Sequence, residues 1–600
     1  MRRLTLSLLV LLLSLWLVAC AGGAAPAEKK EAAPAKTEEP KAAVKTEEPK
    51  AAAKTEEAAP AKTEEAAPAK TEEPKAAATE APKEEPAPAK TEEAKAASGS
   101  GSAEPITIVF SNIAETATLD PAIAFSSDGL EFVRNVYEGL LEYTPASTEL
   151  RPALAESWEV SKDGLSYTFK LRSGVKYQDG AEFNAEAAKI GLDRIKEVNQ
   201  GPASLMTDIK AIEVVDPQTL KITLSRPNVF FLGVLPKLAL VSPKAIEDHK
   251  TDADPWAKDF FATNGVGTGP YKFDSWTKGS QIVILKNKDY WQEWKPNTAD
   301  RVILRVDADI STALQLLAKG EIDMLGAVGP DDSIAAKDLP GVKLVEQPQF
   351  QVSILTLNTN NKPMDNPKVR EAIKYAFDYQ SFVDFFQGLG EIPTGPLPKN
   401  AEGADPSLPP QKQDLEKAKQ LLAEAGYPNG GLKLRYLGLK GLSYEEFAGT
   451  LLQQNLAEIG IELEQILVPW PQMPPTMADK AKAPDISYLN MSMFTNDPTF
   501  ILRTSYHSSN TADKSGYNWS YYVDASVDKA LDEIPTIQDE QKRNDALYKL
   551  QQKIVGDVPA VYAVTPTLAQ PVRDNIEGAV YETLDYNYLV RFFYVQKMPK

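Results

Sequence analysis

Few residues in this 600-residue chain could perform catalytic or redox chemistry. Cys20 is the only cysteine, which excludes an internal disulfide, a cysteine-rich metal site and a CxxC redox pair. The two histidines, His249 and His507, are far apart in the sequence and lack the spacing of a chelating pair. A Ser-His-Asp catalytic site would have to include one of these histidines, and no sequence motif supports such a site. We therefore expect no enzyme activity, no protein-held metal ion and no cofactor.

A glycine-rich run, Gly265-Val-Gly-Thr-Gly-Pro-Tyr271, could in principle expose backbone amides to a phosphate group. No Lys-Ser or Lys-Thr pair follows it, however, and Pro270 leads into the strand-like sequence Tyr271-Lys-Phe273 rather than into a helix. The run therefore predicts a turn that precedes a strand.

The N-terminal residues have the pattern of a secretory signal. Arg2 and Arg3 precede an apolar run from Leu4 to Val18, and a membrane-spanning helix would need roughly 20 such residues. The run ends in Leu17-Val-Ala-Cys20, which resembles a lipobox, where the peptidase cuts before the cysteine and the thiol receives a lipid. We predict a signal peptide at 1–19 and a lipid anchor on Cys20. The alternative is an ordinary cysteine in a discarded signal peptide.

Residues 20–102 form a low-complexity segment in which Lys-Thr-Glu-Glu recurs between alanines and prolines. The repeat begins at Lys36, Lys45, Lys54, Lys62, Lys70 and Lys90. The segment has no aromatic residue, and its prolines interrupt any long helix. Because it can bury too little apolar surface to offset the entropy of ordering, we expect a disordered tether. A specific cell-wall or partner-binding repeat is the alternative.

The remaining part of the chain, roughly 500 residues, is too long for one hydrophobic core, so we expect two or more lobes. The net charge of the chain is −19, and most of it lies in residues 103–600. Such an acidic body argues against binding to nucleic acid and against direct adsorption to anionic lipid. We therefore expect the body to meet the membrane only through its lipid anchor. We also expect the protein to be a monomer.

Strand and helix patterns are interleaved in this part. Residues 167–172, 281–286 and 301–306 predict strands. Residues 414–425 predict a helix with Asp414 as its N-cap and Gly426 as its stop signal. A second helix is predicted at 451–459, before a strand at 461–468. This order predicts an α/β protein with several mixed sheets.

Several sequence blocks in this part occur in the order that a known family shows. They are Thr118-Leu-Asp-Pro-Ala122, Asn135-Val-Tyr-Glu-Gly-Leu-Leu141, Pro152-Ala-Leu-Ala-Glu-Ser-Trp-Glu-Val160, Leu171-Arg-Ser-Gly-Val-Lys-Tyr-Gln-Asp-Gly180, Gly267-Thr-Gly-Pro-Tyr-Lys-Phe273, Asn287-Lys-Asp-Tyr-Trp291, Val369-Arg-Glu-Ala-Ile-Lys-Tyr-Ala-Phe-Asp378 and Lys417-Ala-Lys-Gln-Leu-Leu-Ala-Glu-Ala-Gly-Tyr427. In these blocks the chain resembles the family-5 solute-binding proteins, the dipeptide, oligopeptide and nickel binding components of ABC importers.

The resemblance implies a two-lobed α/β fold of the large periplasmic-binding-protein type, the dipeptide-binding class II, with mixed sheets and a hinge between the lobes. Lobe I would comprise residues 104–355 and 562–600, and lobe II residues 356–561. The implied function is to capture a peptide-like or other small organic solute between the lobes and to deliver it to the permease subunits of an ABC importer. The alternative is a surface-anchored sensor or adhesion protein that uses the same fold.

The resemblance also implies a pocket segment at 485–498. In the dipeptide-binding relatives an aspartate three positions before the Asp-Pro pair of this segment holds the α-ammonium group, and Phe494 stands there in this chain. A ring cannot replace a charge-assisted hydrogen bond of about 1.5–3 kcal/mol. The nickel-type relatives place a histidine directly after the pair, where Thr499 stands. A free dipeptide and a histidine-bound nickel complex are therefore both disfavoured as ligands.

Further positions are implied to contact the ligand. Lys440 lies near the position of a carboxylate-binding arginine and could offer a point charge, unless it is a solvated surface lysine. Trp519 could stack on a ligand or belong to the core. The predicted ligand-binding residues are Phe125, Ser126 and Ser127 in the first lobe and Lys440, Asn490, Met493, Phe494 and Trp519 in the second. The aromatic and methionine side chains among them imply a pocket more apolar than a zwitterion binder needs.

Overall fold

The computed structural model describes residues 104–112, 114–307, 309–326, 328–582, 584 and 589–599. The predicted signal peptide 1–19, the predicted lipidation site Cys20 and the predicted tether 20–102 lie outside these residues. No helix within the described ranges is long and apolar enough to cross a membrane.

One large mixed sheet runs through both lobes, in the strand order β16-β15-β17-β13-β18-β11-β1-β10-β9-β8. The strands along this path are β16 (Ile461–Val468), β15 (Leu432–Leu439), β17 (Ile486–Ser492), β13 (Gln351–Leu357), β18 (Ala560–Arg573), β11 (Met324–Leu325), β1 (Thr107–Asn112), β10 (Arg301–Val306), β9 (Gln281–Lys286) and β8 (Tyr271–Thr277), while β12 (Val342–Pro348) and β14 (Gly390–Glu391) also pair with β18. Strand β15 is parallel to both β16 and β17, whereas β13 is antiparallel to β17 and β18. The predicted mixed sheet is confirmed.

Lobe I adds a second, four-stranded sheet and several short helices to its part of the large sheet. The second sheet has the order β4 (Ala155–Val160), β5 (Ser166–Leu171), β7 (Thr219–Leu224) and β6 (Ile209–Asp216), and β2 (Leu141–Tyr143) pairs with β3 (Leu150–Pro152). The helices are α1 (Ser127–Val136), α2 (Ala185–Val198), η1 (Gly201–Met206), η2 (Phe231–Lys237), α3 (Pro243–His249), α4 (Lys258–Phe261), α5 (Ile310–Lys319) and α6 (Pro330–Lys337). Near the C-terminus β19 (Ile576–Glu577) pairs with β20 (Gln596–Lys597), and η7 (Phe592–Tyr594) lies between them.

Lobe II is richer in helices. They are α7 (Pro367–Ala376), α8 (Tyr379–Phe385), α9 (Leu415–Glu424), α10 (Ser443–Ala457), η3 (Trp470–Gln472), α11 (Met473–Ala478), α12 (Pro498–Tyr506), η4 (Ser508–Asn510), η5 (Ala512–Lys514), α13 (Ala525–Glu533), η6 (Ile534–Thr536) and α14 (Glu540–Asp557). Helix α9 begins as predicted, since the Asp414 side chain accepts a hydrogen bond from the backbone N–H of Lys417. Helix α10 begins eight residues before the predicted start, because its first turns carry fewer large apolar side chains than its end.

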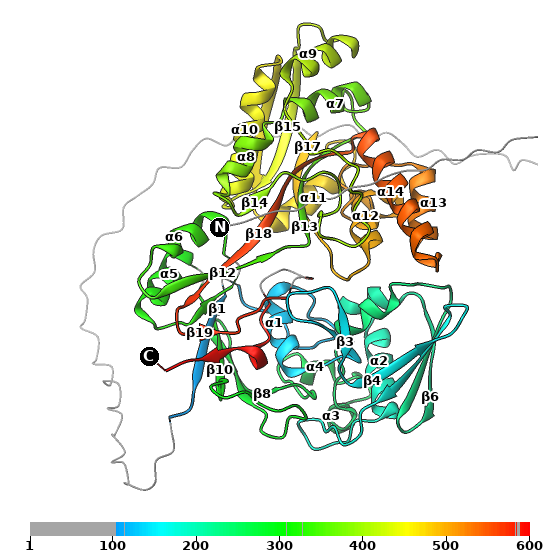
Figure 1. The fold of residues 1–600 in the computed structure, drawn as a ribbon, viewed down its shortest axis with the longest axis vertical. Helices are drawn as coiled ribbons and strands as arrows, with labels where there is room; N and C mark the ends of the chain where they lie inside the picture. The colour runs from blue at the N-terminus through cyan, green and yellow to red at the C-terminus, as the bar shows by residue number, and fades with distance from the viewer. Residues whose placement is uncertain are drawn as a thin grey trace, which may run out of the picture. The chain divides into compact units, whose positions relative to one another are not determined.

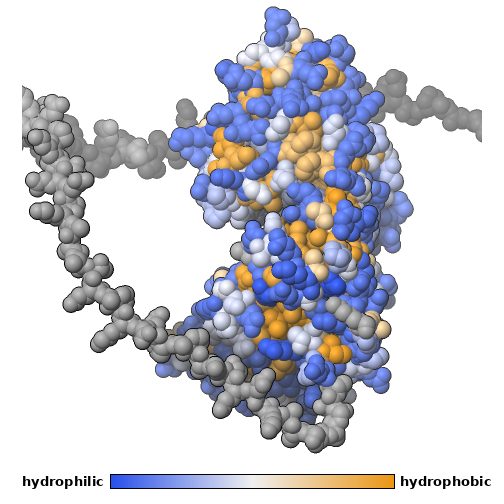
Figure 2. All heavy atoms as spheres, turned by 90° about the vertical axis from the view of Figure 1, so that its left-hand side faces the viewer, coloured by the Kyte–Doolittle hydropathy of each residue, from blue (hydrophilic) through white to orange (hydrophobic). Residues whose placement is uncertain are grey.

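The strands β13 and β18 carry the chain between the lobes, as Figure 1 shows. Two large hydrophobic clusters lie almost wholly in lobe I and two others almost wholly in lobe II. The predicted two-lobed architecture is therefore confirmed. Both predicted lobe boundaries fall inside the crossing strands, and the exact division at 355/356 and 561/562 stays a prediction. On the face seen in Figure 2, hydrophilic residues cover most of the surface and apolar residues form separate patches.

A buried ion pair explains one of the recognised sequence blocks. Asp120, in the Leu-Asp-Pro block, receives two hydrogen bonds of 2.7 Å from the guanidinium group of Arg194 on α2. The Asp120 and Arg194 side chains are 0% and 1% exposed. Arg194 also donates from Nε to the carbonyl oxygen of Trp256 (2.9 Å) and lies 4.5 Å from the ring centroid of Phe261. The pair therefore ties the start of lobe I to α2 and α4.

Replacing Arg194 with methionine should strongly destabilise the protein, because it leaves the Asp120 carboxylate buried without its cation. We expect a loss of about 3–5 kcal/mol in the free energy of unfolding, measured by urea denaturation. The control is Lys244→Ala, which removes an exposed ion pair with Asp248 on α3 and should leave the unfolding midpoint unchanged. Equal midpoints for both variants would contradict the structural role of the pair.

Candidate ligand-binding site

A cavity of about 230 Å³ lies where the crossing strands meet both lobes. Its lining comes from lobe I (Val328, Gly329, Pro330, Ser333), from the crossing strands and the approach to them (Gln349, Gln351, Ser353 and residues 566–570) and from lobe II (Phe386, Leu389, Leu442, Tyr444, Asn490). None of these described lining residues is an acid or a base; the polar ones carry amide or hydroxyl groups. We call this space the hinge cavity. A solute held there would touch both lobes at once.

The polar floor of the hinge cavity is built by the register of β13 against β17. Ser353 lies opposite Asn490 and Gln351 opposite Ser492, so the four side chains share one face of the sheet. The Oδ1 atom of Asn490 accepts hydrogen bonds from Ser353 Oγ (2.6 Å) and Gln351 Nε2 (3.1 Å). Ser492 Oγ donates to Gln351 Oε1 (3.1 Å). The predicted site residue Asn490 is thus held in a fixed orientation at the cavity.

Tyr444 completes this network from the first turn of α10. Asn490 Nδ2 donates to the Tyr444 hydroxyl oxygen at 3.3 Å. The next residue, Glu445, accepts a hydrogen bond from the backbone N–H of Leu439 (2.8 Å), and Glu446 accepts one from Gly441 (2.8 Å). The two carboxylates fix the loop between β15 and α10. That loop carries Lys440, whose side chain is exposed.

The carboxyl ends of the parallel strands of lobe II form one edge, the usual place for ligands in α/β sheets. Lys440 follows β15, Trp470 follows β16, and Asn490 lies near the end of β17. The pairing of β17 with β15 stops at Ser487. On that side no strand among the described residues pairs with 488–492, so this part of β17 is an open strand edge.

The two lobes touch each other through aromatic side chains. Phe125 packs on Phe494, with ring centroids 4.7 Å apart. The Nζ atom of Lys237, a buried residue at the end of η2, lies 5.1 Å from the Phe494 ring centroid and 5.3 Å from that of Tyr143. The backbone N–H of Asn496 donates to the Tyr143 hydroxyl at 3.1 Å. The structure thus brings the predicted residues Phe125 and Phe494 together, as a contact between lobes.

A second contact joins the loop after β7 to α13 and η6. The backbone N–H of Val229 donates to the carbonyl oxygen of Pro535 (2.9 Å), and Arg226 donates to that of Asp532 (3.3 Å). The guanidinium carbon of Arg543 lies 5.5 Å from the ring centroid of Phe230. The lobes therefore also contact each other through segments other than the crossing strands.

The other predicted site residues lie in different surroundings. Ser126 is exposed and precedes α1, and Ser127 is half-buried as its first residue. Met493 is buried in a hydrophobic cluster of lobe II. Trp519 is 1% exposed and lies nearly parallel to Trp470 (6.1 Å between centroids) and Tyr517 (6.3 Å). A direct ligand contact by each of these residues stays a prediction.

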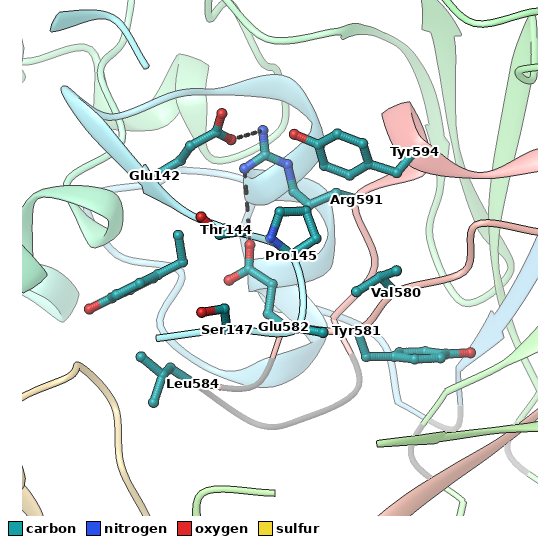
Figure 3. A pocket seen from close by; sticks show the side chains of 12 residues that line it. Glu142, Thr144, Pro145, Ser147, Val580, Tyr581, Glu582, Leu584, Arg591 and Tyr594 are labelled. Atoms are coloured by element: carbon teal, nitrogen blue, oxygen red, sulfur yellow. Dashed lines mark ion pairs between the residues drawn. The ribbon is translucent and has the colours of Figure 1, made fainter. Parts of the chain in front are cut away.

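A separate, charged cavity within lobe I is drawn in Figure 3. Arg591 lies between two carboxylates there, 3.4 Å from Glu142 and 4.0 Å from Glu582. Burial alone would lower the pKa of Arg591, but these carboxylates raise it above its usual range. The cavity measures about 20 Å³, roughly the space of a single water molecule. It cannot hold a solute; the ion pairs instead tie the C-terminal segment to β2, which carries Tyr143.

Comparison with known proteins agrees with this geometry. Residues 149–513 match the model of the bacterial extracellular solute-binding proteins, family 5. The chain belongs to this family. It is 30% identical over 488 residues to the glutathione-binding protein GsiB of Escherichia coli, which covers 79% of this chain and 91% of GsiB. The recognised family is therefore confirmed.

Solved structures show the same fold. The periplasmic binding protein DppA of Helicobacter pylori, in complex with the peptide STSA, is 27% identical with a TM-score of 0.70, over 82% of this chain and 98% of DppA. NikZ of Campylobacter jejuni, in complex with Ni(L-His), has a TM-score of 0.71 over 82% of this chain and 100% of NikZ. At 23% identity, this second likeness concerns the fold alone.

Several residues of the binding protein's site could not be found from the sequence. Tyr444, Gln351, Ser353 and Gln570 meet at the hinge cavity only through strand register and the crossing of the chain. No feature of the sequence around Lys237 distinguishes this buried residue from a surface lysine. Trp470 and Tyr517, at 43% and 44% exposure, are the accessible rings beside Trp519.

Glu445 should make the stability of the binding protein depend on pH. Burial raises the pKa of its carboxyl from 4.5 to about 7, although the hydrogen bond from Leu439 opposes this. The folded state therefore holds the proton more tightly than the unfolded state, and its stability is lost as the pH rises from about 4.5 to 7. Glu445→Gln keeps an acceptor for Leu439 and cannot ionise.

We expect the wild-type free energy of unfolding to fall by about 2–3 kcal/mol relative to Glu445→Gln between pH 4.5 and 7.5. Urea denaturation at four pH values across this range measures the difference. Parallel curves for the two proteins would show that the carboxyl does not titrate in this window.

Gly233 tests the contact between the lobes. A Cβ atom at this position would overlap Asn496 Oδ1 and lie 3.0 Å from the Tyr143 hydroxyl. Gly233→Leu should therefore hold the lobes apart, increase the radius of gyration in X-ray scattering and weaken solute binding at least tenfold. The control is Gly556→Leu on α14, where a Cβ atom meets nothing within 4 Å. Unchanged scattering and affinity for Gly233→Leu would refute this contact.

Proposed function

We propose that this protein is the lipid-anchored, solute-binding component of an ABC importer. It captures a peptide-like or other small organic solute between its lobes and delivers it to the permease subunits. The observation that carries the proposal is the hinge cavity, whose lining comes from both lobes and from both crossing strands. A solute bound there favours the closed form, because only that form provides all of these contacts. We propose no enzyme activity.

The open edge of β17 supports a peptide-like solute. An extended backbone can pair with an unpaired strand edge, and side-chain pockets beside it then select the sequence. The peptide in the DppA complex and the glutathione named for GsiB are both solutes with peptide bonds. Free dipeptides remain disfavoured, since Phe494 provides no charge for an α-ammonium group and packs on Phe125 instead.

The sequence of the N-terminal region supports a proposal for the anchor and the location. We propose that Cys20 carries the lipid, that residues 21–102 form the tether, and that the monomeric body works outside the cytoplasmic membrane. A long tether suits a binding subunit that must reach solutes and return to a membrane-bound permease.

Native mass spectrometry of residues 103–600, purified without refolding, tests solute binding directly. We expect a co-purified small molecule of definite mass. Asn490→Ala should weaken binding of that molecule at least tenfold in calorimetry, because it removes the centre of the polar floor. Gln541→Ala, on the exposed face of α14, is the matched control. A bare protein mass, with no binding in a screen of peptides, sugars and metal chelates, would refute solute binding.

A further inference from the structure

We infer that the hinge cavity recognises an uncharged carboxamide group of the solute, such as a peptide amide, with Tyr444 as hydrogen-bond donor and Gln570 as acceptor. This inference rests on the proposed function, since it presumes that the solute enters the cavity between the lobes. It adds the chemical class of the group that is bound there.

The first observation concerns Gln570 on β18. It lines the cavity and is 1% exposed, and its Oε1 atom is buried without a hydrogen-bond partner among the described residues. A buried acceptor without a donor costs about 1–3 kcal/mol. Such an atom in the wall of a ligand cavity is accounted for when the ligand supplies the missing donor.

The second observation concerns the remaining hydrogen-bonding capacity of the polar floor. Asn490 Oδ1 already accepts two hydrogen bonds, from Ser353 and Gln351. The Tyr444 hydroxyl oxygen accepts one from Asn490, so its own proton is available to a ligand. The pKa of Tyr444 is raised, chiefly by burial and also by Glu445, so the hydroxyl stays protonated and can donate.

The third observation is electrostatic. The described lining includes no cation that could pair with a carboxylate. Charged residues adjoin the lining in sequence. Asp331 and Asp332 lie in the first turn of α6 beside Pro330 and Ser333. Glu445 follows Tyr444, and the exposed Lys440 precedes Leu442 by two residues. The pKa of Asp332, which is half-buried, is raised first by burial and then by the exposed Asp331. A carboxylate would therefore lose its hydration in this cavity and find no cation in the described lining.

These observations together select one kind of group. A carboxamide has a carbonyl oxygen for the Tyr444 hydroxyl and an N–H for Gln570 Oε1, and it has no charge to desolvate. The apolar part of the lining, Phe386, Leu389 and Leu442, provides contacts for the carbon atoms next to that group.

Three probes of matched size test the inference by calorimetry: N-acetyl-Ala-Ala-amide, N-acetyl-Ala-Ala as the free acid, and Ala-Ala-amide with a free amine. We expect the wild-type protein to bind the doubly blocked amide at least tenfold more tightly than the free acid. Gln570→Leu and Tyr444→Phe should each reduce the affinity for the amide at least tenfold and reduce the preference over the acid. Gln541→Leu on α14 serves as the control, and thermal unfolding confirms that each variant is folded.

Equal or tighter binding of the free acid, or unchanged affinities in both variants, would overturn the inference and leave solute binding intact. Failure of the wild-type protein to bind any of the three probes would also overturn it. Native mass spectrometry then separates the two hypotheses: a co-purified solute would preserve the proposed function with a different ligand class, and its absence would remove both.

Discussion

The pairing of β13 with β18 is the constraint on which the rest of the structure depends, because both strands carry the chain from one lobe to the other. Their register shifts between Ser353 and Ile354, which marks a local irregularity in the ladder. Such irregularities bend a strand and weaken its pairing at one point. Ser353 also lies in the floor of the hinge cavity. The residues around which the lobes would turn are therefore also residues that a bound solute would touch, which couples binding directly to closure.

Local features of this fold could be predicted from the sequence, whereas features that depend on distant residues could not. The cap of α9 could be predicted because it is local: the Asp414 side chain accepts a hydrogen bond from a backbone N–H only three residues further on. Asp120 belongs to a recognisable block, but its partner Arg194 is 74 residues away, and nothing in either segment identifies the other. The sequence predicted only the second half of helix α10. The residues of its first turns do not form a continuous apolar face, because Tyr444 accepts a hydrogen bond from Asn490 and Glu445 accepts one from the end of β15.

The same distinction applies to the candidate site. Phe125 and Phe494 come from segments that the family resemblance singled out, and they do meet, although as a contact between lobes. Gln570 lies in a strand that is buried along almost its whole length, so no alternation of apolar and polar residues marks it. Trp519 and Trp470 are both tryptophans near the carboxyl edge of lobe II, and only tertiary packing decides that the first is buried and the second accessible.

The contact between Phe125 and Phe494 also limits where the energy for closure can come from. An aromatic pair contributes about 0.5–1.5 kcal/mol beyond its buried area, whereas moving a two-state equilibrium from 1:99 to 99:1 requires about 5.5 kcal/mol. The rings can bias the lobes toward closure but cannot hold them closed alone. The remaining free energy must come from the other contacts between the lobes, such as the hydrogen bond from Val229 to Pro535, and from contacts with a bound solute. In the described structure the buried acceptors without a donor at the junction of the lobes include Gln570 Oε1 in the wall of the hinge cavity and Asn496 Oδ1 beside Gly233. Under the proposed function, a solute that donated a hydrogen bond to Gln570 would add to the contacts between the lobes and would be selected by the same bond.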